Sequence, residues 1–172
     1  AAPSHGFARN SEWTLLEHRE NEQGVIIELG LRPNEQTLTL WPHQFDARLI
    51  IEVSDTLKVT LDIVNTDQHA WTFSGALHTY LNVADIREVS VRGIGSDYID
   101  SLQNEKACQG GDVLQLSDTI DRVYTQPESH IKVADSRFAR TLVVENSGHN
   151  AAVLWNPWAA GAQAMADMAD DG

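Results

Sequence analysis

Residues 24–31 read GVIIELGL and place an apolar side chain at every second position, at Val25, Ile27, Leu29 and Leu31. Successive side chains of a β-strand point to opposite faces, so this spacing places all four on one face of a half-buried strand. The same alternation recurs later in the chain, at Leu57, Val59, Leu61 and Ile63. Both stretches are therefore predicted to be strands.

Further stretches are rich in β-forming residues and are bounded by Gly, Pro, Asn or Asp: residues 13–18, 48–53, 73–83, 88–91, 130–133, 141–145 and 153–155. Residues 159–169 lack a strong apolar stripe and include Gly161, so they are predicted to be a loop. Residues 103–117, with Gly110 and Gly111, are predicted to be a surface loop at an oligomer contact or the rim of a site. Short strands joined by turns indicate an all-β fold, an antiparallel sandwich or barrel.

The composition is that of a globular domain. The 172 residues include 42% hydrophobic and 22% charged side chains, a length and balance that fit one domain with a buried core. Twelve Lys and Arg oppose twenty-five Asp and Glu, for a net charge of −13. Nucleic acids and anionic membranes bind clustered positive charge, so neither is an expected partner.

Cys108 is the only cysteine, so no intrachain disulfide is possible and a reducing compartment, the cytoplasm, is the expected location. The first residues have no signal-peptide pattern, and no apolar run approaches the roughly 20 residues that cross a bilayer. The chain opens without Met and closes in ADMADDG. We therefore expect an incomplete protein.

Seven histidines occur without an HxH pair, an HExxH motif or a Cys partner at zinc spacing, so no metal is expected. Motifs of the GxGxxG, P-loop and GxSxG types are also absent from the sequence. A functional site must therefore be assembled from dispersed side chains.

The segment FSGALHTYLNVADI, residues 73–86, is the most informative candidate. In a strand, Leu77, Thr79, Leu81 and Val83 would face the core and Ala76, His78, Tyr80 and Asn82 the other side. A concave face with imidazole, phenol and amide groups can line a sugar-sized pocket. The alternative is that His78 is an ordinary half-exposed strand histidine and Tyr80 a packing partner.

Three other motifs admit two interpretations each. In SHGFARN, His5 and Arg9 flank Gly6 and can point into one cleft, where the guanidinium would bind a carboxylate or phosphate; the alternative is a salt bridge with Glu12. In IDRVY, Asp121 beside Arg122 is either a site carboxylate or half of a solvated pair. The tryptophans of WNPW are either a sugar-stacking platform or buried under a turn.

Taken in order, HGFARNSEW, WPHQF, ALHTYLNVADI, VRGIGSDYID, DRVY and WNPW resemble the hexose-6-phosphate mutarotases, or glucose-6-phosphate 1-epimerases, of the aldose 1-epimerase superfamily. The resemblance spans nearly the whole chain, and ALHTYLNVADI is its most specific block. It implies one β-sandwich domain of the galactose mutarotase type over residues 1–172, with a sugar pocket on the concave face and no metal or organic cofactor.

The resemblance also implies roles for individual residues. His78 matches the general acid of the family, and Asp121 matches its substrate-binding aspartate. Arg9 matches a sugar-phosphate-binding arginine, with Ser4 and His5 beside it. A further phosphate-contacting Arg in the N-terminal portion and the general-base Glu on a C-terminal strand would lie outside residues 1–172, so the chain is expected to hold about half a site.

The function expected from the resemblance is an isomerase that interconverts the α and β anomers of a hexose 6-phosphate by acid and base catalysis. The partner is then a small sugar phosphate, and the protein is a monomer or a weak homo-oligomer. Two alternatives stay open: a carbohydrate-binding or regulatory module without catalysis, and a mutarotase for unphosphorylated aldoses.

Overall fold

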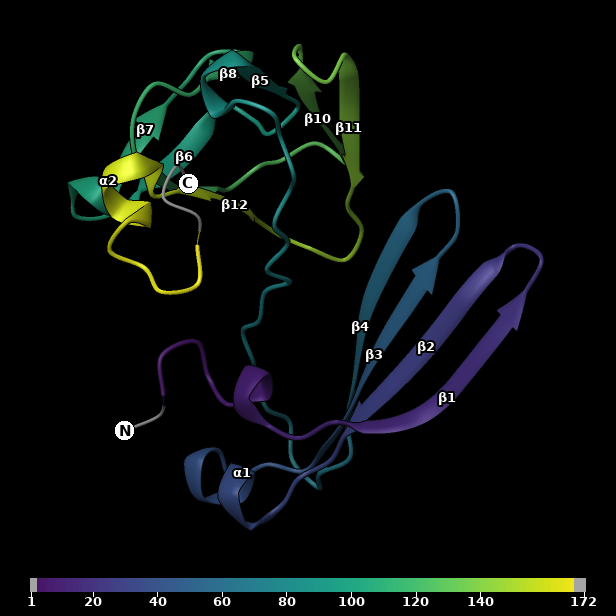
Figure 1. The fold of residues 1–172 in the computed structure, drawn as a ribbon. Coiled ribbons are helices and arrows are strands. Elements are labelled where there is room, and N and C mark those ends of the chain that lie inside the picture. The colour runs from purple at the N-terminus through teal and green to yellow at the C-terminus, as the bar shows by residue number, and fades with distance from the viewer. Residues whose placement is uncertain (1–2, 169–172) are drawn as a thin grey trace. The chain divides into compact units, whose positions relative to one another are not determined.

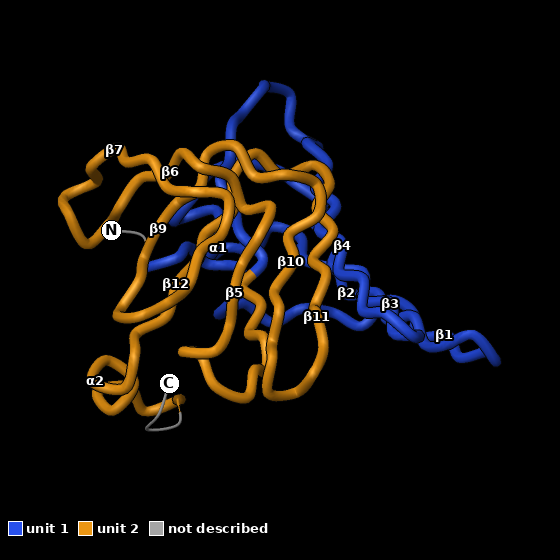
Figure 2. The backbone as a smooth tube through the Cα atoms, turned by 90° about the horizontal axis from the view of Figure 1, so that it is seen from above, with its two compact units in different colours: residues 1–77 blue, residues 78–172 orange. Residues whose placement is uncertain are grey.

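The computed structural model describes residues 3–168 and divides the chain into two compact units, residues 1–77 and residues 78–172 (Figure 2). Each unit has a hydrophobic cluster of its own. No helix among the described residues is both long and apolar enough to cross a membrane.

Residues 1–77 form one antiparallel sheet of four strands in the order β1-β2-β3-β4 (Figure 1). The strands are β1 (Thr14–Asn21), β2 (Gly24–Leu31), β3 (Phe45–Val53) and β4 (Leu57–Asn65). Two short helices accompany them, η1 (Ala8–Asn10) and α1 (Glu35–Leu40). The four strands predicted in this part of the sequence are confirmed, whereas α1 was not predicted.

The register of this sheet explains the alternation in the sequence. Leu29 of β2 lies opposite Leu49 of β3, which lies opposite Leu61 of β4. Residues directly opposite one another share a face, so the apolar positions of the three strands line up on one side. Three of them, Leu31, Phe45 and Ala47, are buried and have partly buried aromatic rings around them.

Residues 78–172 contain two sheets of four antiparallel strands, ordered β11-β10-β5-β8 and β12-β9-β6-β7. The strands are β5 (Val89–Arg92), β6 (Asp97–Asp100), β7 (Lys106–Gln109), β8 (Val113–Gln115), β9 (Ile120–Tyr124), β10 (His130–Asp135), β11 (Arg140–Glu145) and β12 (Ala152–Asn156). Three short helices complete the unit: η2 (Ile86–Glu88), η3 (Ser101–Gln103) and α2 (Trp158–Ala162).

The two sheets share one core. Val91 and Val133 from the first sheet and Ile120 and Tyr124 from the second belong to a single cluster of buried side chains. Burial of apolar surface contributes about 25 cal/mol per Å², so this shared cluster stabilises the pairing of the sheets. The predicted all-β fold, an antiparallel β-sandwich, is confirmed in this unit.

The predicted strand over residues 73–83 is wrong. These residues lie outside every helix and strand of the structure. A β-strand requires a hydrogen-bonded neighbour, and within residues 3–168 none pairs with this stretch. Alternation alone therefore could not decide its conformation.

Two predicted loops contain regular secondary structure over part of their length. Residues 103–117 contain the edge strands β7 and β8, which pair with β6 and β5. Within residues 159–169, α2 forms one helical turn after Pro157, a residue that suits a helix start because its fixed φ fits the helix. Residue 169 lies outside the described residues.

Candidate functional site

The segment that contains His78 connects β4 to η2 without regular secondary structure. His78 and Tyr80 are exposed, and their ring centroids lie 4.8 Å apart with 30° between the ring planes. Side chains two residues apart on an extended chain point to the same side, so this contact agrees with the predicted placement of both rings on one face. The other predicted face is buried only in part, because Leu77 and Val83 are half-buried while Leu81 is exposed.

Trp155 of β12 lies against both rings. Its indole centroid is 6.1 Å from the His78 ring at 71°, and 6.5 Å from the Tyr80 ring at 82°. Aromatic pairs favour such edge-to-face contacts, because the positive ring edge meets the negative ring face. We call His78, Tyr80 and Trp155 the aromatic cluster.

Asp121 of β9 lies directly opposite Trp155 of β12 in the antiparallel register. Opposite residues point to the same face, with Cβ atoms typically about 4.5–5.5 Å apart. The Asp121 carboxylate therefore shares its face with the indole that contacts His78. Trp155 thus contacts His78 and lies opposite Asp121, the two site residues predicted in residues 78–172.

Arg122 faces the other side of β9. Its Nη1 donates a hydrogen bond to the Tyr124 hydroxyl at 3.2 Å, and its guanidinium lies 4.2 Å from the centre of the Tyr98 ring. Burial raises the pKa of the Tyr98 hydroxyl, although the charge of Arg122 opposes this. The alternative that Asp121 and Arg122 form a solvated pair is therefore wrong, because neighbouring strand residues point in opposite directions.

Ser4, His5 and Arg9 belong to residues 1–77 and are exposed. His5 and Gly6 adopt left-handed backbone angles, with φ of 62° and 73°, and the Gly6 amide donates to the Pro3 carbonyl at 3.0 Å. This tight turn is followed by η1, which contains Arg9. That His5 and Arg9 point into one cleft stays a prediction.

Phe7 fixes this loop to the first unit. Its ring packs at 5.9 Å from Phe45 and 6.3 Å from Trp41, and the Trp13 indole donates to the Ala8 carbonyl at 2.8 Å. Because Phe7 points inward, the polar side chains of the loop stay at the surface. Among the salt bridges of residues 3–168, none involves Arg9 or Glu12, so the alternative of a pair between them is not found.

The sequence left two interpretations open for Tyr80 and for Trp155, one as part of a sugar pocket and one as a packing residue. WNPW had two open interpretations, and the structure leaves Trp155 half-buried beside His78 rather than enclosed under a turn. Trp155 is identified as a site residue because it lies opposite Asp121 in the sheet. This position depends on how β9 and β12 pair, which neither strand's sequence shows by itself.

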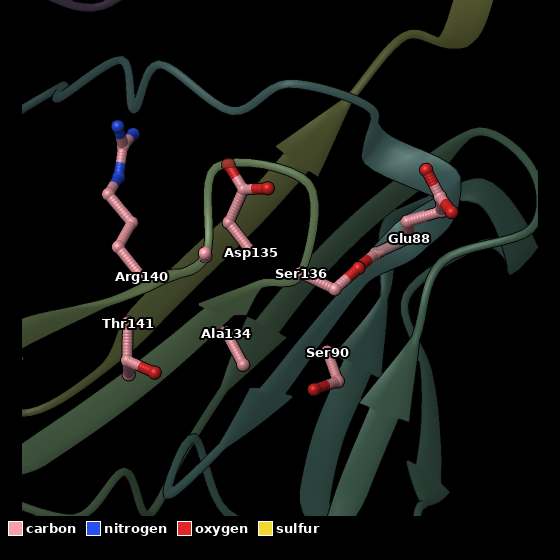
Figure 3. A pocket seen from close by; sticks show the side chains of 8 residues that line it. Glu88, Ser90, Ala134, Asp135, Ser136, Arg140 and Thr141 are labelled. Carbon is pink, nitrogen blue, oxygen red and sulfur yellow. The ribbon is translucent and has the colours of Figure 1, made fainter.

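Two cavities lie elsewhere in the second unit. One, of about 300 Å³, is lined by residues of β5, β10 and β11, among them Ser90, Asp135 and Arg140 (Figure 3). The other, of about 550 Å³, is lined by residues of β6 and β7 and by Thr125. Neither includes His78 or Asp121. Within the described residues, no group of three His, Cys, Asp or Glu side chains is placed to hold a metal ion.

The second unit is therefore an antiparallel β-sandwich whose second sheet carries the Trp155 indole, with Asp121 opposite it and the exposed His78 ring against it. The sequence pattern shared by the aldose 1-epimerase family matches residues 1–172, and the chain belongs to that family. The resemblance drawn from the six motifs is confirmed.

Two curated relatives share the name "Putative glucose-6-phosphate 1-epimerase". The Escherichia coli (strain K12) protein is 37% identical over 171 residues, which cover 99% of this chain and 57% of that protein. The Cenchrus ciliaris protein is 36% identical over 181 residues, which cover 96% of this chain and 54% of that protein. The chain therefore spans a little over half the length of these relatives.

Solved structures agree with the fold. The crystal structure of a "putative mutarotase" from Salmonella typhimurium superposes with a TM-score of 0.89 at 37% identity, and covers 99% of this chain and 57% of that one. The crystal structure of HI1317, at 24% identity and a TM-score of 0.75, covers 98% of this chain and 57% of that one and supports the fold alone. The predicted galactose mutarotase type of β-sandwich is confirmed.

Proposed function

We propose that the protein interconverts the α and β anomers of a hexose 6-phosphate. The observation that carries this proposal is the placement of the exposed His78 ring against Trp155, which lies opposite Asp121. The names of the relatives support the substrate class. The same proposal places the protein in the cytoplasm, where a lone thiol such as that of Cys108 stays reduced.

The reaction needs one proton donor and one proton acceptor. A carboxylate removes the proton of the C1 hydroxyl, the C1 carbonyl forms, and the bond between C1 and the ring oxygen breaks. His78 donates its proton to that ring oxygen. Rotation about the C1–C2 bond and the reverse transfers close the ring as the other anomer. Imidazole suits the donor role because it gains and loses a proton near neutral pH.

The neighbours of His78 suit the sugar. Asp121 accepts hydrogen bonds from substrate hydroxyls, and the rings of Tyr80 and Trp155 cover the apolar C–H face of the hexose. For the 6-phosphate, the resemblance to the family implies Arg9 of the first unit, whose guanidinium can bind a phosphate in a bidentate manner, with Ser4 and His5 nearby in the sequence. One local cation of this kind is needed in a protein whose net charge is −13.

The proposal is tested by the exchange between the two anomers of glucose 6-phosphate, measured by exchange NMR with the intact protein. We expect His78→Asn to lower the catalysed rate by about 100-fold or more, because a general acid contributes about 10²- to 10⁴-fold. His130→Asn is the matched control, because His130 is an exposed histidine on β10 with Glu145 as its neighbour at 3.4 Å. A wild-type rate in His78→Asn contradicts the assignment.

The same measurement separates the alternatives. A carbohydrate-binding module without catalysis would raise its melting temperature with the sugar phosphate and leave the exchange rate at its value in water. A mutarotase for unphosphorylated aldoses would accelerate glucose at least as much as glucose 6-phosphate. Either result refutes the proposed substrate or the proposed catalysis.

The role of Arg9 predicts substrate selectivity. We expect Arg9→Ala to raise KM for glucose 6-phosphate about tenfold or more, since a hydrogen bond to a charged group is worth about 1.5–3 kcal/mol. KM for glucose should change little. Arg19→Ala is the control, because Arg19 is an exposed strand arginine that pairs with Glu17 at 2.8 Å. Equal losses for the two sugars would assign Arg9 a structural role.

A further inference from the structure

Arg9 lies in η1, a single helical turn whose own hydrogen bonds are long. The Asn10 amide donates to the Phe7 carbonyl at 3.2 Å, and the Ser11 amide donates to the Ala8 carbonyl at 3.3 Å. These distances are at or beyond the upper limit usual for N–H···O bonds, and a single turn is marginal in water without tertiary contacts. The conformation around Arg9 therefore depends on groups that bind η1 from outside it.

Two side chains that follow η1 donate to the same two carbonyls. The Ser11 hydroxyl donates to the Phe7 carbonyl at 2.8 Å, and the Trp13 indole Nε1 donates to the Ala8 carbonyl at 2.8 Å. A carbonyl oxygen has two lone pairs, so each accepts a backbone and a side-chain hydrogen bond together. The Ala8 carbonyl belongs to the planar peptide that joins Ala8 to Arg9. The Trp13 indole thus fixes the peptide from which Arg9 begins.

The Trp13 indole is a well-placed donor because both the sheet and the core hold it. Thr14, the next residue, is the first of β1 and lies opposite Gly30 of β2. Trp13 itself is half-buried and packs against the buried cluster of the first unit, as Phe7 also does. The turn that contains Arg9 is therefore attached to the four-stranded sheet at two points, the Phe7 ring and the Trp13 indole.

We propose that Trp13 is a positioning residue for Arg9, assisted by Ser11: their hydrogen bonds hold the turn in place before the substrate binds and so increase the affinity for the 6-phosphate. A cation on an ordered loop loses less conformational entropy when it binds an anion than one on a loop that must first become ordered. Neither side chain needs to touch the substrate for this effect. The inference rests on the proposed role of Arg9 in binding the phosphate.

The test uses three variants of the intact protein. Trp13→Phe keeps an aromatic ring and removes the donor, and Ser11→Ala is a smaller change that removes the other donor. Trp71→Phe is the matched control, because Trp71 packs against the same buried cluster and its Nε1 donates to the Gln44 carbonyl at 3.1 Å, outside the turn. The first readout is the hydrogen exchange of the Asn10 and Ser11 amides, which needs no substrate.

We expect Trp13→Phe to raise KM for glucose 6-phosphate about two- to tenfold, the change that loss of one neutral hydrogen bond produces. KM for glucose should change little, because glucose has no phosphate for Arg9 to bind. Ser11→Ala should act in the same direction, and both variants should speed the exchange of the turn amides. Trp71→Phe should leave the amide exchange and the ratio of the two KM values as in the wild type.

A double-mutant cycle shows whether Trp13 acts through Arg9. In the Arg9→Ala background, Trp13→Phe should leave KM for glucose 6-phosphate unchanged, because two residues that act as one unit are not additive. An equal rise in KM with and without Arg9 overturns the inference, since it would reflect a general structural effect. Unchanged exchange of the turn amides in Trp13→Phe, or an equal effect of Trp71→Phe on the KM ratio, also overturns it.

Failure of the proposed function gives a different result. If the wild type does not accelerate anomer exchange, the proposed catalysis fails, and the same cycle is measured on the dissociation constant for glucose 6-phosphate by calorimetry. A loss of affinity in Trp13→Phe that disappears in the Arg9→Ala background still supports the positioning role. Additive losses, or no measurable binding by the wild type, overturn it.

Discussion

The surroundings of His78 depend on two ring contacts rather than on hydrogen bonds. Tyr80 comes from the same segment as His78, and Trp155 comes from β12, 77 residues after His78 in the sequence. The short-range contact follows from the spacing of two residues, whereas the long-range contact requires the sandwich to form. Trp155 is therefore the residue that connects His78 to the sheet that contains Asp121.

Replacement of Trp155 tests this connection. We expect Trp155→Leu to lower kcat for anomer exchange about two- to tenfold and Trp155→Phe to retain most activity, since an aromatic pair is worth about 0.5–1.5 kcal/mol. The His78 ring proton shifts in the NMR spectrum should move in Trp155→Leu, because the indole ring current is lost. Val153→Ala is the control, on the same strand and face and 59% exposed. An unchanged kcat in Trp155→Leu would show that the indole does not contribute to the site.

At the scale of elements, α1 shows how local chemistry fixes a helix that periodicity does not reveal. Asn34 accepts a hydrogen bond from the Thr37 amide at 2.9 Å, and the Thr37 hydroxyl oxygen accepts from the Asn34 amide at 2.9 Å. This reciprocal arrangement satisfies two backbone donors at the helix start. Thr37 is 2% exposed, so the cap also closes the end of the helix toward the core.

Loss of this cap should be measurable. We expect Asn34→Ala to lower the free energy of unfolding by about 1 kcal/mol, because Ala cannot accept the Thr37 amide hydrogen. Gln36→Ala is the control: Gln36 is exposed in the same helix, and Ala is a good helix former. Equilibrium unfolding in urea measures both. Equal stability of Asn34→Ala and the wild type would show that the cap contributes nothing.

At the scale of the whole molecule, acid should destabilise the fold. Hydrogen bonds from the side chain and the backbone amide of Arg87 lower the pKa of Asp85 from its ordinary value to about 2. Backbone hydrogen bonds from Gln44 and Gln68 lower the pKa of Asp67. A carboxyl group with a depressed pKa binds fewer protons in the folded than in the unfolded state. Its stabilisation is present above the ordinary pKa and is lost as the pH falls toward the folded value.

We therefore expect the free energy of unfolding to fall as the pH is lowered from about 5 toward about 2, within the window set by the Asp85 pKa. Asp85→Asn should flatten this dependence, because it removes the proton uptake of that group. Asp55→Asn, at the exposed turn between β3 and β4, serves as the control. Urea titrations at several pH values measure the slope. If the free energy of unfolding of Asp85→Asn falls as steeply with pH as that of the wild type, Asp85 is not the group responsible.

The sequence by itself determined the strands with a continuous apolar alternation, such as residues 24–31 and 57–63, because alternation is a local property of the sequence. It did not determine their burial, since Leu57 and Leu61 are exposed. It also determined the family, because the six motifs are local and occur in a fixed order. The roles of Ser4, His5, Arg9, His78 and Asp121 stay predictions that this order supports.

Only the tertiary structure decided which stretches find a strand partner. Residues 73–83 have the alternation of a strand but no neighbour, while β7 and β8 have little alternation and pair at the edges of their sheets. It also decided that Trp155 lies opposite Asp121 and against His78. The physical reason is that register and ring contacts come from residues far apart in the sequence, and their energies exist only once both sheets have formed.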